Sequence, residues 1–273
     1  MSKGADSCGI SQSAATQHVK EVERRLRTTL FDRSKRPLEL TEAGRIYHEF
    51  AREVLRLEEQ MERAIESLEG GGTVRVASIY SIGLTEMSRL QERFTACLPQ
   101  AHLQVEYMRP DRIYKSVRDD SADLGLVSYP ESSREIAAIP WRQEEMQLAV
   151  APSHEFAARR EVRPSELAGQ DFIAFDEDLS IRREMDRFFR AQSVEVRVVM
   201  HFDNIQTIKE AVALGKGIAI LPARTMQTEI AQSRLVAVRL DAPGLVRPVG
   251  VVHRKRKTLT RATRAFLELL DGE

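Results

Sequence analysis

Short polar side chains lie on one face of the segment that follows Ser11. They are Gln12, Ser13, Thr16, Gln17 and Lys20. Gln can pair bidentately with adenine, Ser and Thr can bind either base type, and Lys reaches phosphate or guanine. These side chains are therefore suited to contacts in the major groove of DNA. The alternative is an ordinary amphipathic surface helix with a solvated polar side, and this helix alone does not decide between the two.

A basic turn supplies a second kind of candidate contact. The run from Asp32 to Pro37 lies between Leu30-Phe31 and residues 38–41, which are short enough to form the second strand of a hairpin wing. The cations of this turn are Arg33, Lys35 and Arg36. On a hairpin they would contact the DNA backbone and position the helix without reading base sequence.

Hydroxyl, carboxylate and amide groups occur where predicted strands end and helices begin. They belong to Ser78, Tyr80, Ser81, Ser128, Ser180, Asp203, Asn204 and Thr207. In open α/β sheets a ligand binds beyond the carboxyl ends of the strands, near helix N-termini that favour negative charge. Each residue alone is better explained as a helix cap, but as a convergent set they predict a pocket. We expect the ligand to be a small anion or carboxylate, with Arg182 beside Ser180 as a candidate cationic partner.

Motifs of catalysis and metal binding do not accompany these residues. The sequence has no G-x-S-x-G, no glycine-rich phosphate loop and no histidines at ligand spacing. Cys8 and Cys97 are far apart and form no C-x-x-C, which argues against a disulfide framework and a zinc site. Cys97 lies on an apolar helix face beside Leu98 and is predicted to be a core residue. We expect no enzymatic activity and no cofactor.

Helical periodicity predicts the elements that position the first group of residues. Residues 11–26 form a helix capped by Ser11, with an apolar stripe of Ala15, Val19, Val22 and Leu26. From Thr41 to Leu68 apolar residues step by three or four, which favours a coiled-coil helix. Its predicted dimerisation seam is Tyr47, Phe50, Val54, Leu57, Met61, Ala64 and Leu68. A core helix of a globular domain is the alternative, but Glu and Arg at most remaining positions leave only a narrow seam.

Beyond the glycines of residues 70–72, strands alternate with helices. Strands are predicted at 73–79, 103–107, 124–127, 148–151, 172–175, 196–202, 218–221, 236–240 and 249–252. Helices are predicted at 84–97, 113–117, 181–191, 205–214 and 259–270. This alternation indicates βαβ units and parallel sheets.

Length and charge limit the classes of protein that fit. The 273 residues can form more than one core, and Lys+Arg and Asp+Glu both number 41, so bulk charge gives no support for DNA binding. The basic run at 253–257 could contact DNA, but a solvated turn explains it better. No secretory signal and no apolar segment long enough to span a membrane is evident. We therefore expect a cytoplasmic protein without a membrane partner.

The order and spacing of residues 10–44 resemble the DNA-binding signature of the LysR family of bacterial transcription regulators. The matching segments are Ile10 to Thr16, Val22-Glu23, Leu30 to Arg33 and Leu40 to Gly44. The resemblance implies that residues 11–26 are the recognition helix, that Arg33 lies in the wing, and that the long helix pairs two subunits. The family normally has a further helix before this point, whereas this chain begins almost inside the second one. We therefore expect incomplete cover for the apolar stripe and weak DNA binding by the chain as given.

Residues 73–270 resemble the effector domain of the same family, although more loosely. The resemblance rests on Gly215 to Pro222, Pro164 to Leu167 and Asp123 to Val127. It implies a periplasmic-binding-protein-like α/β domain of two Rossmann-like lobes, in which the positions matching 78–83 line the effector cleft. The predicted organisation is a winged helix-turn-helix at 1–45, a linker and dimerisation helix at 46–69, and an effector domain at 73–273.

The resemblance also implies partners and a mechanism. Promoter or operator DNA, a small-molecule effector and further copies of the chain in a dimer or tetramer are expected, with RNA polymerase as another candidate. Effector binding would reorient the lobes and change the spacing of paired DNA-binding domains. One alternative is a stand-alone small-molecule-binding protein of the same fold with impaired DNA binding. An exported solute-binding protein would not need the recognition helix, and an enzyme would need a nucleophile or base.

Overall fold

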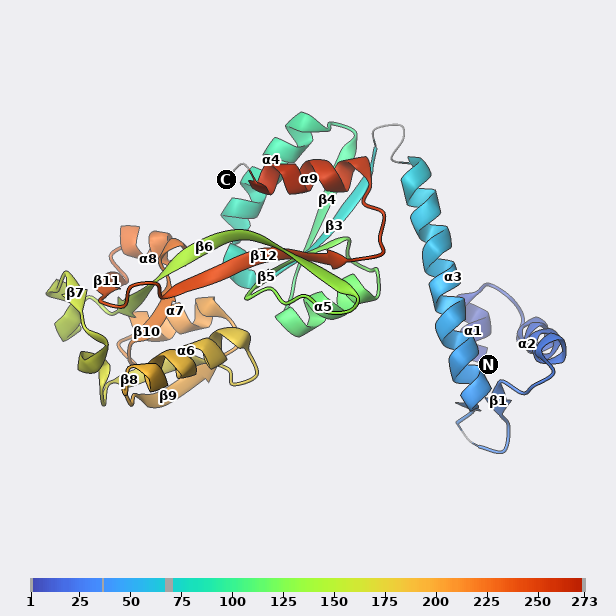
Figure 1. The fold of residues 1–273 in the computed structure, drawn as a ribbon, viewed down its shortest axis with the longest axis horizontal. Coiled ribbons are helices and arrows are strands. Elements are labelled where there is room, and N and C mark those ends of the chain that lie inside the picture. The colour runs from blue at the N-terminus through green and yellow to red at the C-terminus, as the bar shows by residue number, and fades with distance from the viewer. Residues whose placement is uncertain (1, 36, 67–70, 272–273) are drawn as a thin grey trace. The chain divides into compact units, whose positions relative to one another are not determined.

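The computed structural model describes residues 2–35, 37–66 and 71–271, and the chain divides into two compact units, Met1–Arg63 and Ala64–Glu273 (Figure 1). The first unit contains α1 (Ser2–Ser7), α2 (Gln12–Leu26), a hairpin of β1 (Phe31–Asp32) and β2 (Glu39–Leu40), and most of α3 (Glu42–Glu66). The predicted recognition helix, wing and long helix are all present. Helix α1 was not predicted.

Side-chain contacts fix the ends of α2 and the start of α3. Ser11 Oγ accepts a hydrogen bond of 3.2 Å from the Ala14 N–H and caps α2, as predicted. Near the other end, buried Glu23 accepts a hydrogen bond of 2.8 Å from the Leu30 N–H and holds the start of the hairpin against the helix. A Cβ at Gly44 would lie 2.0 Å from the Leu30 carbonyl oxygen, so only glycine allows α3 to pack this closely on the hairpin.

Two long antiparallel strands run through both lobes of the second unit. Strand β6 (Ile136–Val150) pairs with β12 (Val246–Arg254) from Ile136 opposite Arg254 to Glu145 opposite Val246. Ile136 lies in the core of the first lobe, whereas the other end of β6, from Met146, lies in the core of the second. Figure 1 shows these strands side by side. They are the structural connection between the lobes.

The first lobe has the parallel strands β3 (Gly72–Ser78), β4 (Ala101–Tyr107) and β5 (Leu124–Ser128), in the order β4-β3-β5-β12. A 3-10 turn (Tyr80–Ile82) follows β3, and the helices are α4 (Leu84–Cys97), α5 (Pro110–Arg118) and α9 (Arg261–Asp271). Phe94 of α4 packs edge-on against Phe266 of α9, with ring centroids 5.8 Å apart. The C-terminal helix therefore completes the core of the first lobe.

The second lobe is built on the opposite ends of β6 and β12, which we call the crossing strands. Its strands are β7 (Glu161–Val162), β8 (Asp171–Phe175), β9 (Arg197–Phe202), β10 (Ala219–Pro222) and β11 (Val236–Leu240). Its helices are α6 (Ser180–Ala191), α7 (Ile205–Ala213) and α8 (Gln227–Ala231). Strands β10 and β11 pair with β6, and β8 pairs in parallel with β9. The predicted fold class of two α/β lobes is confirmed.

One strand prediction and one core prediction in this unit were wrong. The strand expected at 148–151 begins at Ile136 instead. Its first part contains polar residues, a composition typical of a loop, but these residues bind one another: Glu144 accepts hydrogen bonds from Arg142 and from Arg247 of β12. Cys97 is exposed as the last residue of α4, and its neighbour Leu98 packs against the core instead. No helix in the part of the chain that is described has the length and apolar character needed to cross a membrane.

Candidate functional site

The polar side chains predicted to read DNA lie together on α2. Gln12, Ser13, Thr16, Gln17 and Lys20 line one open, shallow hollow. The Thr16 hydroxyl donates to the Gln12 carbonyl at 2.8 Å, which ties one hydroxyl to the backbone. On the other side of the helix, Ala15, Val19 and Val22 are half-buried and Leu26 is exposed. The apolar stripe is thus only partly covered.

The cations of the hairpin pair with carboxylates of their own unit. The Arg33 guanidinium donates to Glu23 at 2.8 Å, and the Lys35 ammonium donates to Glu39 at 2.7 Å. Both cations remain about half exposed, so phosphate would compete with these carboxylates or share the cations with them. Arg36 lies outside the described residues.

The apolar seam predicted on α3 faces solvent. Phe50, Val54, Leu57 and Met61 are each more than half exposed, with Phe50 at 69%. Tyr47 is half-buried, the side chain of Ala64 is not described, and Leu68 lies outside the described residues. A row of large apolar side chains at helical spacing is available for a partner.

A cleft lies between the two lobes of the second unit, at the ends of β3, β5, β8 and β9. Its lining includes six of the predicted residues: Tyr80, Ser81, Ser128, Ser180, Asp203 and Asn204. Two others do not line it. Ser78 is fully buried and donates to the Ile79 carbonyl at 3.2 Å. Thr207 donates its N–H to the Asn204 side chain at 3.0 Å, so this pair is a helix cap.

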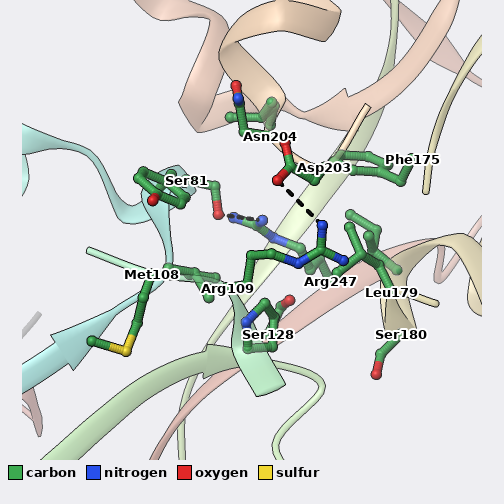
Figure 2. A pocket seen from close by; sticks show the side chains of 15 residues that line it. Ser81, Met108, Arg109, Ser128, Phe175, Leu179, Ser180, Asp203, Asn204 and Arg247 are labelled. Atoms are coloured by element: carbon green, nitrogen blue, oxygen red, sulfur yellow. Dashed lines mark hydrogen bonds and ion pairs between the residues drawn. The ribbon is translucent and has the colours of Figure 1, made fainter. Parts of the chain in front are cut away.

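Arg247 is a cleft residue that the sequence reasoning missed. Its guanidinium is 2% exposed, forms an ion pair with Glu144 on the neighbouring strand, and donates to Ser81 Oγ at 2.8 Å (Figure 2). The predicted strand begins at residue 249, two positions after Arg247, so the pattern leaves this arginine outside the predicted strand. Its burial next to a predicted ligand hydroxyl places a fixed cation at the base of the cleft.

Arg109 is the second missed residue, and it precedes α5 at the end of β4. It forms ion pairs with Asp178 at 2.6 Å, Asp203 at 3.2 Å and Asp176 at 3.5 Å. Figure 2 shows its side chain pointing toward Asp203. Partial burial acts to lower the pKa of Arg109, but its bonds to Asp178 and Asp203 outweigh this and raise it. The strand-end rule used for β3, β5 and β9 would have found Arg109 if applied to β4.

The candidate cation Arg182 does not line the cleft. It donates to Asp186 and to the Phe175 carbonyl, both at 2.9 Å. Apolar side chains complete the walls: Ile79, Met108, Pro110, Phe175, Leu179, Ile181 and Ile205. The cleft has a volume of only about 50 Å³, far below the roughly 300–1,000 Å³ of pockets that hold drug-sized ligands. A larger molecule therefore needs the lobes to separate or side chains to move.

A chain of ion pairs leads away from Arg247. Glu144 also accepts from Arg142 at 2.8 Å, and Arg142 donates to Glu86 of α4 at 2.9 Å. Glu86 accepts in turn from Arg224 of the second lobe at 2.9 Å. This network connects the base of the cleft to both crossing strands and joins the two lobes at a second place.

A DNA-binding unit joined to a two-lobed domain with a polar cleft defines a ligand-responsive regulator. Residues 1–45 match the family model described as bacterial regulatory helix-turn-helix protein, lysR family, and residues 68–273 match the LysR substrate binding domain. The chain belongs to the LysR family of transcription regulators.

Relatives and solved structures agree with this assignment. The RuBisCO operon transcriptional regulator of Allochromatium vinosum is 26% identical over 277 residues, covering 99% of this chain and 90% of that protein. A full-length OxyR variant from Pseudomonas aeruginosa has a TM-score of 0.72 and 20% identity, covering 98% of this chain and 91% of that one. The regulatory domain of CcmR from Synechocystis PCC6803, solved in complex with 2-PG, has a TM-score of 0.67 and 24% identity, covering 74% and 96%. The structures establish that the fold is shared.

Proposed function

We propose that this regulator binds promoter DNA through α2 and the hairpin, and that a small anion or carboxylate bound in the cleft is its effector. The observation that carries the proposal is the convergence of Arg109, Arg247 and the Ser81 hydroxyl on one cleft. Cations and hydroxyl donors at strand ends are suited to an anionic group. The 2-PG complex of the CcmR regulatory domain supports a small-molecule site in this fold.

DNA binding is assigned to the hollow on α2. Gln12, Gln17 and Lys20 are exposed there, and these side chains can contact base edges or phosphate. Arg33, Lys35 and Arg36 are proposed to contact phosphate. The division into 1–45, 46–69 and 73–273 remains our proposal for the functional segments. A regulator of transcription works where the DNA is, so we also propose a cytoplasmic location.

A DNA-shift assay with fragments flanking the gene tests this assignment. Gln17→Ala and Lys20→Ala should each weaken specific binding, by roughly tenfold for a lost base contact. His18→Ala is the matched control, because His18 is exposed on the same helix but does not line the hollow. Equal losses in all three variants, or no loss in any, would contradict the assignment.

Self-association is assigned to the exposed seam of α3. Burying Phe50, Val54, Leu57 and Met61 against a partner helix would remove large apolar surfaces from water. Leu57→Lys with Met61→Lys should therefore reduce the particle mass in light scattering. The matched control is Glu58→Lys with Glu62→Lys, since both glutamates are exposed on the same helix. An unchanged mass in the first double variant would exclude this seam as the main interface, whether for a dimer or a tetramer.

The proposed mechanism links the two sites through the relative position of the lobes. An effector in the cleft contacts both lobes, and the resulting shift passes to the paired linker helices and changes the spacing of the DNA-binding domains. Contact with RNA polymerase is a further proposal for the DNA-bound form. Calorimetric screening of organic acids and inorganic anions tests the effector class. Binding of only neutral or cationic compounds would refute it.

Arg109→Gln and Arg112→Gln form a matched pair for the effector site. Arg109 precedes α5 and Arg112 lies in its first turn, but Arg112 does not line the cleft. The first variant should weaken anion binding and the second should not.

A further inference from the structure

We propose that the effector is dipolar, with an ammonium group in addition to its anionic group. The first lobe would hold the anion through Arg109, and the second lobe would hold the ammonium through Asp203 and Asp176. This inference rests on the proposed effector function of the cleft and specifies the chemical class of ligand, an amino acid or a close analogue.

The charges that face each other across the cleft belong to different lobes. Arg109 follows β4 in the first lobe, whereas Asp176 and Asp178 follow β8 and Asp203 follows β9 in the second. All three carboxylates lie within 3.5 Å of the Arg109 guanidinium. Asp111 of the first lobe is farther from Arg109, at 3.9 Å, so the carboxylates nearest to this cation belong to the opposite wall.

The size of the cleft makes these ion pairs incompatible with a bound effector. Arg109 and Asp203 line the cleft, whose volume is about 50 Å³, whereas Asp176 and Asp178 do not line it. A ligand must therefore separate Arg109 from Asp203 to enter. Arg109 then loses its partners on the second lobe and Asp203 loses the arginine, whereas Asp176 keeps its contact with His201. A ligand that binds well must supply a negative group to Arg109 and a compensating group to the aspartates.

An anion alone provides a partner for Arg109 but not for the aspartates of the second lobe. Its charge would neutralise Arg109 but would lie close to Asp203 and Asp176, and like charges at short range repel. Arg247 acts on the side of the expected anion, where it donates to Ser81 Oγ, and its ion pair is with Glu144 and not with these aspartates. His201 lies 2.6 Å from Asp176 and is a further partner of that carboxylate.

An ammonium group satisfies the second wall better than a hydroxyl group. Both can donate hydrogen bonds to Asp203, but only the ammonium supplies the positive charge that Arg109 had provided. The Ser81 and Ser128 hydroxyls lie at strand ends of the first lobe, on the side of the expected anion. Met108, Phe175 and Leu179 provide apolar contact for the remainder of the ligand.

Titration calorimetry of the full chain with matched ligands tests the proposal. The first series is L-alanine, L-lactate and propionate, and the second is L-phenylalanine, L-phenyllactate, 3-phenylpropionate and L-phenylalaninamide. In at least one series the amino acid should bind roughly tenfold more tightly than its hydroxy acid and its deaminated acid, because only it restores charge on both walls. L-phenylalaninamide, which lacks the carboxylate, should bind more weakly than L-phenylalanine.

Two variants test which charged groups of the cleft cause the preference for an amino acid over its hydroxy acid. Asp203→Asn should reduce the preference for amino acid over hydroxy acid to less than roughly threefold, while Arg109→Gln should weaken both ligands. Asp241→Asn is the control, since this exposed aspartate does not line the cleft. An unchanged preference in Asp203→Asn would overturn the assignment of that residue.

The outcomes separate this inference from the proposed function. If the plain acids or inorganic phosphate bind as tightly as the amino acids, the dipolar effector is wrong and the anionic effector stands. If the amide binds and the acids do not, the anionic effector is wrong as well. Failure of every amino acid to bind at millimolar concentration would overturn the dipolar assignment.

Discussion

Two groups of ion pairs join the lobes of the effector domain, and they differ in their exposure to water. Arg247 and Glu144 in the crossing strands are 2% and 3% exposed, whereas Arg109 and Asp178 at the cleft are 31% and 69% exposed. Breaking a buried pair leaves an uncompensated charge away from solvent, while exposed partners are rehydrated. The comparison indicates that the crossing strands hold the lobes together and that the cleft pairs are free to exchange partners with a ligand.

Glu144→Gln should give the largest loss of stability. The variant leaves Arg247 and Arg142 without their shared carboxylate, and loss of one partner of a buried pair costs about 3–5 kcal/mol. Urea unfolding followed by the fluorescence of Trp141, the only tryptophan and a residue of β6, measures this loss. Glu145→Gln is the control because Glu145 is its exposed neighbour. Similar losses in both variants would show that burial of Glu144 is not the cause.

Asp123→Asn tests whether the loss of stability depends on the burial of an ion pair or on its position between the lobes. Asp123 lies inside the first lobe and accepts from Arg75 at 2.8 Å and Lys257 at 2.6 Å. Its replacement should cost about 2 kcal/mol at neutral pH, since bonds to charged groups contribute roughly 1.5–3 kcal/mol. A negligible cost in urea unfolding at pH 7 would mean that only pairs between the lobes matter.

The same aspartate should give an acid-dependent stability. Burial acts to raise the pKa of Asp123, but the contacts with Arg75 and Lys257 outweigh it and lower the pKa. A carboxyl whose pKa is lower in the folded state stabilises the protein above its unfolded pKa of about 3.9. That contribution is lost as pH falls through the folded value, so the stability difference between wild type and Asp123→Asn should shrink below about pH 4. A difference that stays constant between pH 7 and pH 3 would contradict this account.

Arg109→Gln should change stability by less than about 1 kcal/mol, because its ion pairs are partly exposed. The same urea experiment measures the change, with Arg112→Gln as the matched surface variant. A loss comparable to that of Glu144→Gln would remove the distinction between the two groups of ion pairs.

Glu166→Gln should have the smallest effect. Bonds from Arg159 and from the Arg163 N–H lower the pKa of Glu166 to about 2. Its stabilisation is present above the ordinary glutamate pKa and is lost as pH falls through about 2. The difference in Tm between wild type and variant should therefore appear at pH 6 and diminish toward pH 2. Differential scanning calorimetry would disprove this account if the difference increased in acid.

Elements with regular periodicity were predictable from the sequence. Helix α4 spans Leu84–Cys97 as predicted, and α2 begins immediately after its predicted cap. Five residues placed after strand ends, together with Ser180 at a helix start, line the cleft, because the carboxyl ends of parallel strands meet at one edge of the sheet in each lobe. In these cases local pattern and overall topology require the same arrangement.

The first part of the crossing strand β6 and the cleft residue Arg247 were not predictable in this way. Arg142 and Glu144 give β6 the composition of a loop, and the partners that stabilise them, Arg247 and Glu86, come from distant parts of the chain. The hydrophobic pattern contains no signal for an ion pair formed across such separations. Arg109 differs, since it follows a correctly predicted strand.

The path of the crossing strands has a consequence for the order in which the protein is made. Residues 161–240 and β6 supply the strands of the second lobe other than the start of β12, so most of this lobe can fold while the chain is still emerging from the ribosome. The first lobe begins earlier in the chain but receives β12 and α9 only when residues 246–271 have been synthesised. We therefore expect the first lobe, whose synthesis starts earlier, to finish folding last, because part of its apolar core stays exposed until Phe266 has been synthesised.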